Sequence, residues 1–441
     1  MSNFGKVLIA GTGPAAVQLA VLFGKEPGTV VAIAGRDSVR AAPFFCALLQ
    51  SGNRVRAEVQ NAQHQALAGE CVLERVFLGY ETVEGEWDTL ILAVAANAYI
   101  EVLRCMPDET LRQVRRIVLL SPTCGSNHLV CHYMAGIQPE AEVISFSTYL
   151  GDTRWAQGEP CERVLTTGMK RKLYVGSSSP VRLSAVDQLC RLYGSAGIVM
   201  QVLPAALEAE TRNISLYVHP PLFMNEFSLD VIFGEGVARK FVYKMFPEGP
   251  ITQQLICEML SGWREMTAIM EKLGIPGVNL LQFMIDDNYP VRPESLSRQD
   301  IEQFMELEPI HQQYLLYVRY TSLLIDPFSE PDEDGRYFDF SAVPFRQIYR
   351  DREGCWDVPR MPKEDDYRVK IIQGIARYVE VECPVIDRFI ARYEQALMQA
   401  ASRLQGQPLS DAFAVQDFAE DVRRICSGLG DRLQGSLSGS S

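Results

Sequence analysis

A glycine-rich turn close to the N-terminus has the residue types that a dinucleotide pyrophosphate needs. The sequence GTGPAA at residues 11–16 follows an apolar run at 7–10 and precedes a segment with helical spacing. Gly11 permits a tight turn, Gly13 lets the backbone approach a phosphate, and Ala16 replaces the third glycine of the G-x-G-x-x-G pattern. Phosphate oxygens would lie at the helix N-terminus, where free N–H groups and the helix dipole favour anions. The predicted cofactor-binding residues of this turn are Gly11, Thr12, Gly13, Pro14 and Ala15.

The end of the second predicted strand carries residues that distinguish NADP from NAD. The strand at residues 30–34 is followed by Arg36, Ser38 and Arg40. A guanidinium group matches the charge and geometry of a 2′-phosphate, so the predicted cofactor is NADPH/NADP+. Asp37 leaves NAD open, because NAD enzymes usually have an acidic residue here for the ribose hydroxyls. Solvated surface charges are the structural alternative for the arginines.

His219 is a candidate acid–base residue at the start of the second half of the chain. It is followed directly by two prolines, which are expected to break regular structure there. Imidazole is the side chain best suited to proton transfer near neutral pH. From spacing alone, a structural histidine fits this position as well as a catalytic one.

A second pair of histidines, His128 and His132, lies with Cys124 and Cys131 in a segment of metal-ligating residue types. The segment directly follows the predicted strand at 117–120, where a crossover helix should begin. No second ligand cluster accompanies it in the sequence. Helix packing is therefore favoured over a metal site, and no metal is predicted.

Three later stretches, at 243–252, 283–290 and 314–328, place charged groups among aromatic residues. Paired carboxylates, an arginine and several tyrosines could hold a zwitterionic substrate that bears a carboxylate. Helix caps and turns are the structural alternative, and Asp-Asn-Tyr-Pro forms turns well. The residue types alone do not separate these two interpretations.

Length and charge limit the class of protein. A chain of 441 residues is too long for one core and predicts two domains. The net charge of -13 argues against nucleic acid and anionic membranes as partners, since both need basic surfaces. The sequence shows no membrane span and no secretory signal. Eleven cysteines without a C-x-x-C pair are typical of reduced thiols and predict a cytoplasmic protein.

Hydrophobic patterning predicts an α/β fold, with an N-terminal Rossmann doubly wound sheet followed by a mostly α-helical catalytic domain. Runs that are apolar throughout suit strands buried on both faces of a parallel sheet. Such runs occur at 7–10, 30–34, 90–94, 117–120, 143–146, 173–175 and 198–203. Helical spacing then dominates at 222–233, 252–273, 310–324 and 367–404. Surface loops are expected near 327–335 and 354–363. The predicted domains are 1–205 and 206–430, with a disordered tail at 431–441.

The charged and aromatic stretches resemble the opine metallophore dehydrogenases, the family of staphylopine, pseudopaline and yersinopine dehydrogenases within the opine dehydrogenase superfamily. The resemblance extends from the glycine-rich turn to about residue 400 and fades in the C-terminal tail. The motifs that carry it are YKMFPEGPIT from residue 243, DDNYPV from 286, QYLLYVRY from 313, DPFS from 326 and DFSAVPFR from 339.

This resemblance implies an NADP-dependent opine dehydrogenase, an oxidoreductase acting on CH–NH groups. Such an enzyme joins the free amine of a histidine-derived, nicotianamine-like compound to an α-keto acid, with pyruvate favoured over 2-oxoglutarate. The two condense to an imine, and hydride from NADPH reduces the imine to a secondary amine. The product is an opine metallophore, so the product binds metal and the enzyme does not. The family also implies a homodimer.

The resemblance further implies roles for individual residues. Opine dehydrogenases pair a histidine with an aspartate, and His219 matches the histidine, which shuttles a proton during carbinolamine and imine formation. Asp326 is the first candidate for its partner, because it follows Arg319-Tyr320, although with a longer spacer than in the family. Asp287 is the second candidate. Arg319 would bind a substrate carboxylate.

Other implied contacts lie elsewhere in the chain. Asp152 matches a position that faces the histidine-derived part of the substrate, and Arg36 and Arg40 match basic residues that bind the 2′-phosphate. The remaining predicted substrate-binding residues are Tyr243, Lys244, Asn288 and Tyr289.

Two other functions remain open at this point. One is an NADP-dependent reductase of a hydroxy or keto acid on the same two-domain plan, which would oxidise NADPH without an amine. The other is a protein that binds NADP without turnover.

Overall fold

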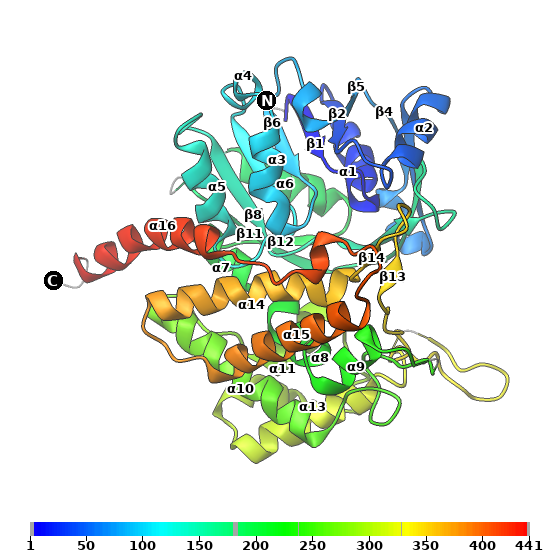
Figure 1. Ribbon diagram of the computed structural model, residues 1–441, viewed down its shortest axis with the longest axis vertical. Helices are drawn as coiled ribbons and strands as arrows, with labels where there is room; N and C mark the ends of the chain where they lie inside the picture. Colours follow the sequence, from blue (N-terminus) through cyan, green and yellow to red (C-terminus); the bar gives the residue numbers. More distant parts are fainter. Residues whose placement is uncertain (1–3, 180–183, 237, 328, 439–441) are drawn as a thin grey trace. The chain divides into compact units, whose positions relative to one another are not determined.

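The chain divides into two compact units, Met1–Asn213 and Ile214–Ser441, in a computed structural model (Figure 1). The boundary expected after residue 205 falls after Asn213 instead, because helix α7 (Ala206–Thr211) packs on strands of the first unit. The structure describes residues 4–179, 184–236, 238–327 and 329–438.

An eight-stranded sheet forms the centre of the first unit, with the strand order β12-β11-β8-β7-β6-β1-β2-β5. The six strands from β8 to β5 are parallel, and their order reverses between β1 and β6, as in a Rossmann fold. The strands are β1 (Lys6–Ala10), β2 (Val30–Gly35), β5 (Arg75–Leu78), β6 (Thr89–Leu92), β7 (Arg116–Leu119), β8 (Glu142–Phe146), β11 (Lys172–Ser177) and β12 (Val199–Val202).

The predicted parallel sheet needs one correction. All seven predicted strands are in this sheet, but β11 pairs antiparallel with β8, and β12 pairs parallel with β11. These two strands therefore run opposite to the other six. Apolar runs indicate that a strand is buried on both faces of a sheet, but they do not indicate its direction. The reversal of β11 and β12 could therefore not be predicted from the hydrophobic pattern.

A second sheet of four strands was not predicted. Its order is β4-β3-β10-β9, and β3 and β10 are its parallel central pair. Polar and apolar residues alternate along β3, and exposed and partly buried residues alternate along β9. This pattern is typical of strands with one face in solvent, and a search for apolar runs misses it. The strands are β3 (Arg54–Val59), β4 (Gly69–Val72), β9 (Gly151–Trp155) and β10 (Arg163–Met169).

Helices cover the sheets of the first unit. Helix α1 (Pro14–Gly24) packs on both sheets and is buried over most of its length, in agreement with its largely apolar sequence. The others are α2 (Ala42–Gln50), α3 (Tyr99–Cys105), α4 (Asp108–Leu111), α5 (Ser126–Met134), α6 (Ser184–Ser195) and α7, with short 3-10 turns η1 (Ala62–Leu67), η2 (Tyr80–Thr82) and η3 (Ala96–Ala98).

A buried carboxyl group, Glu210, fixes α5 and α7 to strand β8. Its oxygens accept hydrogen bonds from the Gly125 N–H at 2.8 Å, the Asn127 N–H at 2.7 Å and the Ser145 hydroxyl at 2.9 Å. Burial raises the pKa of Glu210 from 4.5 to about 8, against the opposing effect of these hydrogen bonds.

This raised pKa predicts a stability that falls with rising pH. Between about pH 4.5 and pH 8 the folded chain binds a proton that the unfolded chain has lost, so the free energy of unfolding decreases across that window. Relative to Glu210→Gln, wild type should lose on the order of 4 kcal/mol between pH 5 and pH 8. Urea unfolding at several pH values measures the difference. A difference independent of pH would contradict the prediction.

The second unit is mostly helical, as its spacing predicts. Helix α8 (Ser215–Phe223) packs against both α10 (Gln253–Lys272) and α14 (Arg360–Tyr378), and α15 (Pro384–Arg403) and α16 (Ala419–Ser438) pack on α14. The remaining elements are α9 (Glu226–Phe233), α11 (Leu280–Gln282), the π-helix η4 (Phe283–Asn288), α12 (Arg298–Glu302), η5 (Phe304–Glu306), α13 (Pro309–Ser322), the short strands β13 (Tyr349–Arg350) and β14 (Trp356–Asp357), and η6 (Asp411–Phe413).

Several predicted bounds in this unit change. The segment 367–404 is two helices, α14 and α15, since a turn separates them at 379–383. The loop expected at 354–363 contains β14 and the first residues of α14. Helix α16 continues to Ser438, so residues 431–438 of the expected disordered tail are helical, and 439–441 lie outside the described residues.

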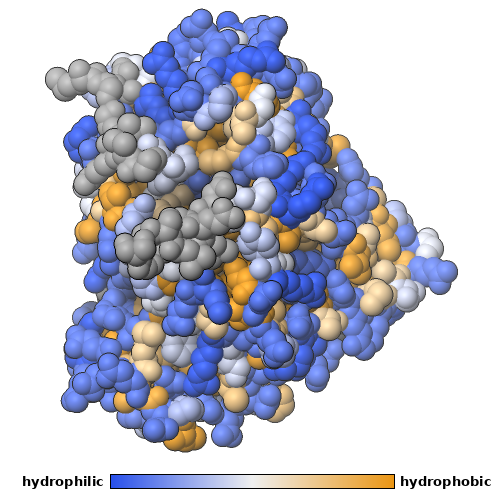
Figure 2. All heavy atoms as spheres, turned by 90° about the vertical axis from the view of Figure 1, so that its left-hand side faces the viewer, coloured by the Kyte–Doolittle hydropathy of each residue, from blue (hydrophilic) through white to orange (hydrophobic). Residues whose placement is uncertain are grey.

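The surface is largely polar where Figure 2 shows it, with hydrophobic residues in small separate groups among hydrophilic ones. Within the described residues, no helix combines the length and the apolar character of a membrane span.

Candidate active site

The glycine-rich turn connects β1 to α1 at the point where the strand order reverses. Gly11 has a φ of 140°, and a Cβ there would lie 2.5 Å from the carbonyl oxygen of Ala93, so this position requires glycine. Its N–H donates to the carbonyl of Ala34 at 2.8 Å, which ties the turn to β2. The tight turn predicted at Gly11 is present.

The space beside Gly13 suits a phosphate. Apart from Gly13 and its two chain neighbours, no heavy atom of the described residues lies within 4 Å of the place that a Cβ on Gly13 would take. Gly13 is the N-cap of α1, and Pro14 is its first residue, where a missing N–H costs no helix bond. Thr12 and Ala15 complete the turn. Open space at the N-terminus of a buried helix fits a pyrophosphate, and this turn is where a dinucleotide would bind.

Arg36 directly follows β2, at the position predicted to select the cofactor. Its Nη2 lies 2.9 Å from Oε1 of Glu101 on α3, and both side chains are 58% exposed. Burial raises the pKa of the neighbouring Tyr80 to about 12, while the positive charge of Arg36 acts in the opposite direction. Arg36 is thus an accessible cation that a phosphate can reach.

Ser38 and Arg40 belong to the turn between β2 and α2. The Ser38 carbonyl accepts hydrogen bonds from the N–H groups of Ala41 and Ala42, both at 3.0 Å, and its hydroxyl accepts from Ala41 at 3.3 Å. Ser38 therefore shapes the turn, which holds Arg40 exposed at the surface.

His219 lies in the last turns of α8, on the side facing α14. Its Nδ1 is 3.5 Å from Oδ1 of Asp365 and 3.1 Å from the sulfur of Met361, both on α14. Asp365 is fully buried, whereas the His219 side chain is 20% exposed. Phe223 packs edge-on against the imidazole with ring centroids 5.3 Å apart. An acceptor at Nδ1 favours the tautomer with its proton there, which leaves Nε2 to exchange protons.

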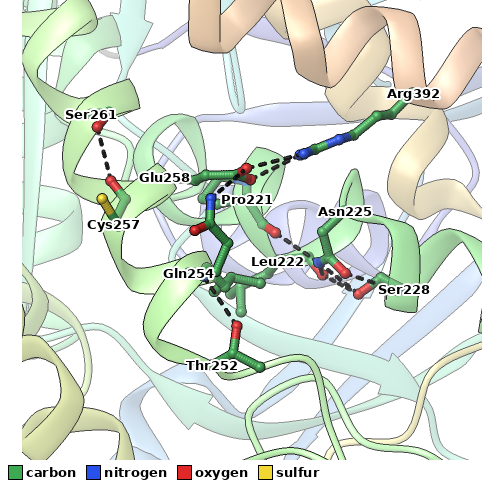
Figure 3. A network of polar contacts seen from close by, with 11 residues as sticks. Pro221, Leu222, Asn225, Ser228, Thr252, Gln254, Cys257, Glu258, Ser261 and Arg392 are labelled. Atoms are coloured by element: carbon green, nitrogen blue, oxygen red, sulfur yellow. Dashed lines mark hydrogen bonds and ion pairs between the residues drawn. The ribbon is translucent and has the colours of Figure 1, made fainter.

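The expected helix break at the prolines is wrong, because Pro220 and Pro221 lie inside α8. The Asn225 side chain binds the last carbonyl groups of α8. Its Nδ2 donates to the carbonyls of Pro221 at 2.8 Å and Leu222 at 3.1 Å. Its Oδ1 accepts from the N–H of Ser228 at 2.9 Å and so begins α9 (Figure 3).

A second set of contacts in Figure 3 joins the helices around α8. Glu258 on α10 accepts two hydrogen bonds from Arg392 on α15, at 2.8 and 3.0 Å. The Thr252 hydroxyl accepts from the Leu255 N–H at 3.1 Å and caps α10. These bonds fix α10 and α15, and α10 packs directly against α8.

The structure places a different carboxylate beside His219 from those expected. Asp365 holds that position, whereas Asp326 and Asp287 were expected there. Asp326 lies in the loop after α13, where its N–H donates to the Phe338 carbonyl at 3.0 Å, and Asp287 lies in the π-helix η4. Asp365 lies between the loop predicted near 354–363 and the helical segment predicted at 367–404, so neither prediction included it. The acidic pair Asp365-Asp366 is present in the sequence, but two adjacent acidic residues do not by themselves indicate burial.

Arg319 is a buried cation on α13. It is 5% exposed, and its guanidinium lies 4.9 Å from the Tyr320 ring centroid. Within the described parts of the chain, no carboxylate pairs with it. Burial lowers the pKa of Arg319, while the neighbouring Tyr320, Tyr243 and Tyr289 raise it. Its buried Nε has no hydrogen-bond partner among the described residues. An uncompensated buried cation is costly to a protein and is typical of a site for an anionic ligand.

Tyr243 feels the charges of both this cation and the carboxylate of the histidine pair. Burial raises the pKa of Tyr243, and the charges of both Arg319 and Asp365 act on its hydroxyl. Tyr289, whose own charge also acts on Tyr243, packs on the Phe340 ring at 5.2 Å. The structure therefore brings together predicted residues from three separate motifs.

Three other predicted residues have local structural contacts. Lys244 lies 3.1 Å from Glu248 and 3.1 Å from Asp339, so two carboxylates already surround it. The Asn288 amide donates to the Phe283 carbonyl at 2.8 Å within the π-helix. Asp152 is in the first unit, on β9, where its carboxylate accepts from the Thr167 hydroxyl at 2.8 Å.

The segment considered for a metal forms helix α5, which contains both His128 and His132. Among the residues that the structure describes, no three His, Cys, Asp or Glu side chains are grouped to hold a metal ion.

Comparison with known proteins agrees with this geometry. A sequence model described as staphylopine dehydrogenase matches residues 5–429. The staphylopine synthase of Staphylococcus aureus is 45% identical over 417 residues, covering 94% of this chain and 96% of that protein. The pseudopaline synthase of Pseudomonas aeruginosa is 38% identical, covering 90% of each. A solved structure of yersinopine dehydrogenase with NADP+ bound is 28% identical, with a TM-score of 0.89 over 99% of this chain and 100% of that one. The chain therefore belongs to the staphylopine dehydrogenase family and is an oxidoreductase of the opine dehydrogenase type.

Proposed function

We propose that this enzyme uses NADPH to join a histidine-derived, nicotianamine-like amine to an α-keto acid, with pyruvate favoured over 2-oxoglutarate, to give an opine metallophore. The observation that carries this proposal is the buried Arg319, which pairs with no carboxylate among the described residues and whose charge acts on Tyr243 together with that of Asp365, the partner of His219. A cation for a substrate carboxylate beside an acid–base pair is what condensation of a keto acid with an amine needs.

The residues of the second unit supply binding and proton transfer. Arg319 would hold a substrate carboxylate, and Tyr243, on which the charges of Arg319 and Asp365 both act, would belong to the same site. His219 takes a proton at Nε2 from the ammonium group of the substrate, and the free amine then adds to the keto carbon to form the carbinolamine. The same proton is returned to the carbinolamine hydroxyl, which leaves as water and gives the imine. Asp365 stabilises the imidazolium between these two steps. Bound NADPH supplies the hydride that reduces the resulting imine.

The first unit would hold the cofactor. The residues fit it: Gly11 permits the tight turn, Gly13 leaves room beside the turn for the pyrophosphate, and Arg36 presents an exposed guanidinium for the 2′-phosphate. Arg40 lies in the following turn and would add positive charge. The NADP+ bound to yersinopine dehydrogenase supports this choice of cofactor.

Arg36→Ala is expected to raise the KM for NADPH about tenfold, because a charge-assisted hydrogen bond to the 2′-phosphate is lost. The KM for NADH should stay within about twofold, since NADH lacks that phosphate. Steady-state kinetics with both cofactors measures the ratio. Arg54→Ala, at an exposed arginine paired with Glu70, is the matched control. An equal rise for both cofactors would show that Arg36 does not select the phosphate.

The proposal is tested by the amine dependence of NADPH oxidation. With keto acid alone, oxidation should stay at background, and addition of the amine should start turnover. Oxidation that is indifferent to the amine would instead indicate a keto-acid reductase. Absence of turnover with every amine and keto acid pair would indicate a protein that only binds the cofactor.

Small molecules are the partners in this proposal. A homodimer in the cytoplasm completes it by analogy with the family. Light scattering on the purified enzyme tests the homodimer, and cell fractionation tests the cytoplasmic location.

A further inference from the structure

We propose that Arg368 is a positioning residue that supplies the permanent counter-charge of Asp365 and so keeps Asp365 available as the ionised acceptor for His219. This inference rests on the proposed function, because it concerns how Asp365 serves the histidine. It extends the His219–Asp365 pair to a row of three charged groups.

Geometry places Arg368 on the oxygen that faces the histidine. Nη1 of Arg368 donates to Oδ1 of Asp365 at 2.8 Å, and the same Oδ1 is 3.5 Å from Nδ1 of His219. Asp365 and Arg368 are three residues apart on α14, a spacing that puts them on one side of the helix. The other oxygen, Oδ2, is buried and accepts no hydrogen bond from any residue that the structure describes.

Burial makes a permanent cation necessary. Asp365 has no exposed surface, and the Arg368 side chain is 8% exposed. An ionised carboxylate in such a place needs a partner of opposite charge. His219 cannot be that partner throughout the reaction, because it is neutral whenever it acts as a base. Arginine stays charged at every working pH, so Arg368 can hold the carboxylate ionised while the histidine gains and loses its proton.

Arg368 is itself held in place on α14. Its Nη2 lies 3.3 Å from Oε2 of Glu364, which also pairs with Arg360 at the helix start. The planar guanidinium thus contacts one carboxylate with each amino group, which fixes its orientation. The other ionisable groups whose charges act with that of Asp365 are Arg360 and Asp366 on α14, Tyr243 before α10, and Tyr393 on α15.

A double-mutant cycle tests whether Arg368 acts through Asp365. We expect Asp365→Asn to lower kcat about 100-fold and Arg368→Met to lower it about tenfold. If Arg368 acts through Asp365, the double variant should be no slower than Asp365→Asn alone. KM values for the amine, the keto acid and NADPH should stay within about twofold. Arg368→Lys should have a higher kcat than Arg368→Met, because lysine restores the positive charge but not the planar guanidinium that contacts two carboxylates.

Thermal unfolding gives a second readout that needs no substrate. Arg368→Met leaves a buried carboxylate without its cation and should be the least stable variant, while the double variant should regain stability. Arg377→Met, at an exposed arginine on the same helix, is the control for both readouts. Should Arg368→Met fail to fold, Arg368→Lys with and without Asp365→Asn gives the same comparison.

The outcomes separate this inference from the proposed function. Losses in kcat that multiply in the double variant, or wild-type kcat in Arg368→Met, would overturn the role of Arg368. Wild-type enzyme that shows no amine-dependent oxidation would refute the proposed function instead. In that case, failure of the double variant to regain stability would overturn the charge pairing as well.

Discussion

Asparagine in place of His219 is expected to lower kcat about 1000-fold, since general acid–base catalysis by a positioned side chain contributes a factor of this order. Asparagine keeps polarity at the site but cannot carry a proton between the amine and the leaving water. KM for NADPH should change less than about threefold, because the cofactor turn is in the first unit. Stopped-flow measurement of NADPH oxidation, with amine and keto acid saturating, gives the rate.

The matched control is His311→Asn, which changes a histidine on α13 whose side chain is 43% exposed. It should keep kcat within about twofold. Circular dichroism and unfolding midpoints check that both variants fold. A His219→Asn enzyme with near wild-type turnover would show that a different group transfers the proton.

Arg319→Met is expected to raise the KM for the keto acid about 100-fold, because loss of one partner of a desolvated charge pair is costly. The same change should stabilise the enzyme without substrate by about 1 kcal/mol, since it removes a buried cation that no described carboxylate pairs with. Loss of binding together with a gain in stability is the signature of a binding residue. Steady-state kinetics and urea unfolding measure the two effects.

Two outcomes would contradict this role for Arg319. One is a variant that is less stable than wild type and keeps its KM, which would mark Arg319 as structural. The other is an unchanged KM for the keto acid with a raised KM for the amine. That result would assign Arg319 to the carboxylate of the amine substrate instead of the keto acid.

The cofactor turn was predictable because its constraints are local. The need for glycine at Gly11 comes from a positive φ and from the carbonyl of Ala93 close by, and the surrounding strand and helix are adjacent in sequence. The place of Arg36 was predictable in the same way, because it directly follows the second strand in the sequence. The alternation of strands and helices was predictable for the same reason, since each buried strand is a short apolar run that can be identified in the sequence.

The partner of His219 was not predictable, because burial of acidic residues is decided by tertiary packing. Asp365 and Asp366 lie in a charged stretch that is typical of an exposed surface, yet α14 packs on both α8 and α15, and both aspartates are buried. Burial raises the pKa of Asp366 to about 6, although Lys370 opposes the shift. The direction of β11 and β12 was hidden for a related reason, since strand direction depends on connections and not on composition.

The proposed reaction is tested most directly by the mass of its product. The purified enzyme would be incubated with NADPH, the nicotianamine-like amine and either pyruvate or 2-oxoglutarate. One product should form with pyruvate, with the mass of amine plus keto acid, less one water and plus two hydrogens, in amounts equal to the NADPH consumed. A hydroxy acid formed from the keto acid, with the amine recovered unchanged, would contradict the proposed condensation.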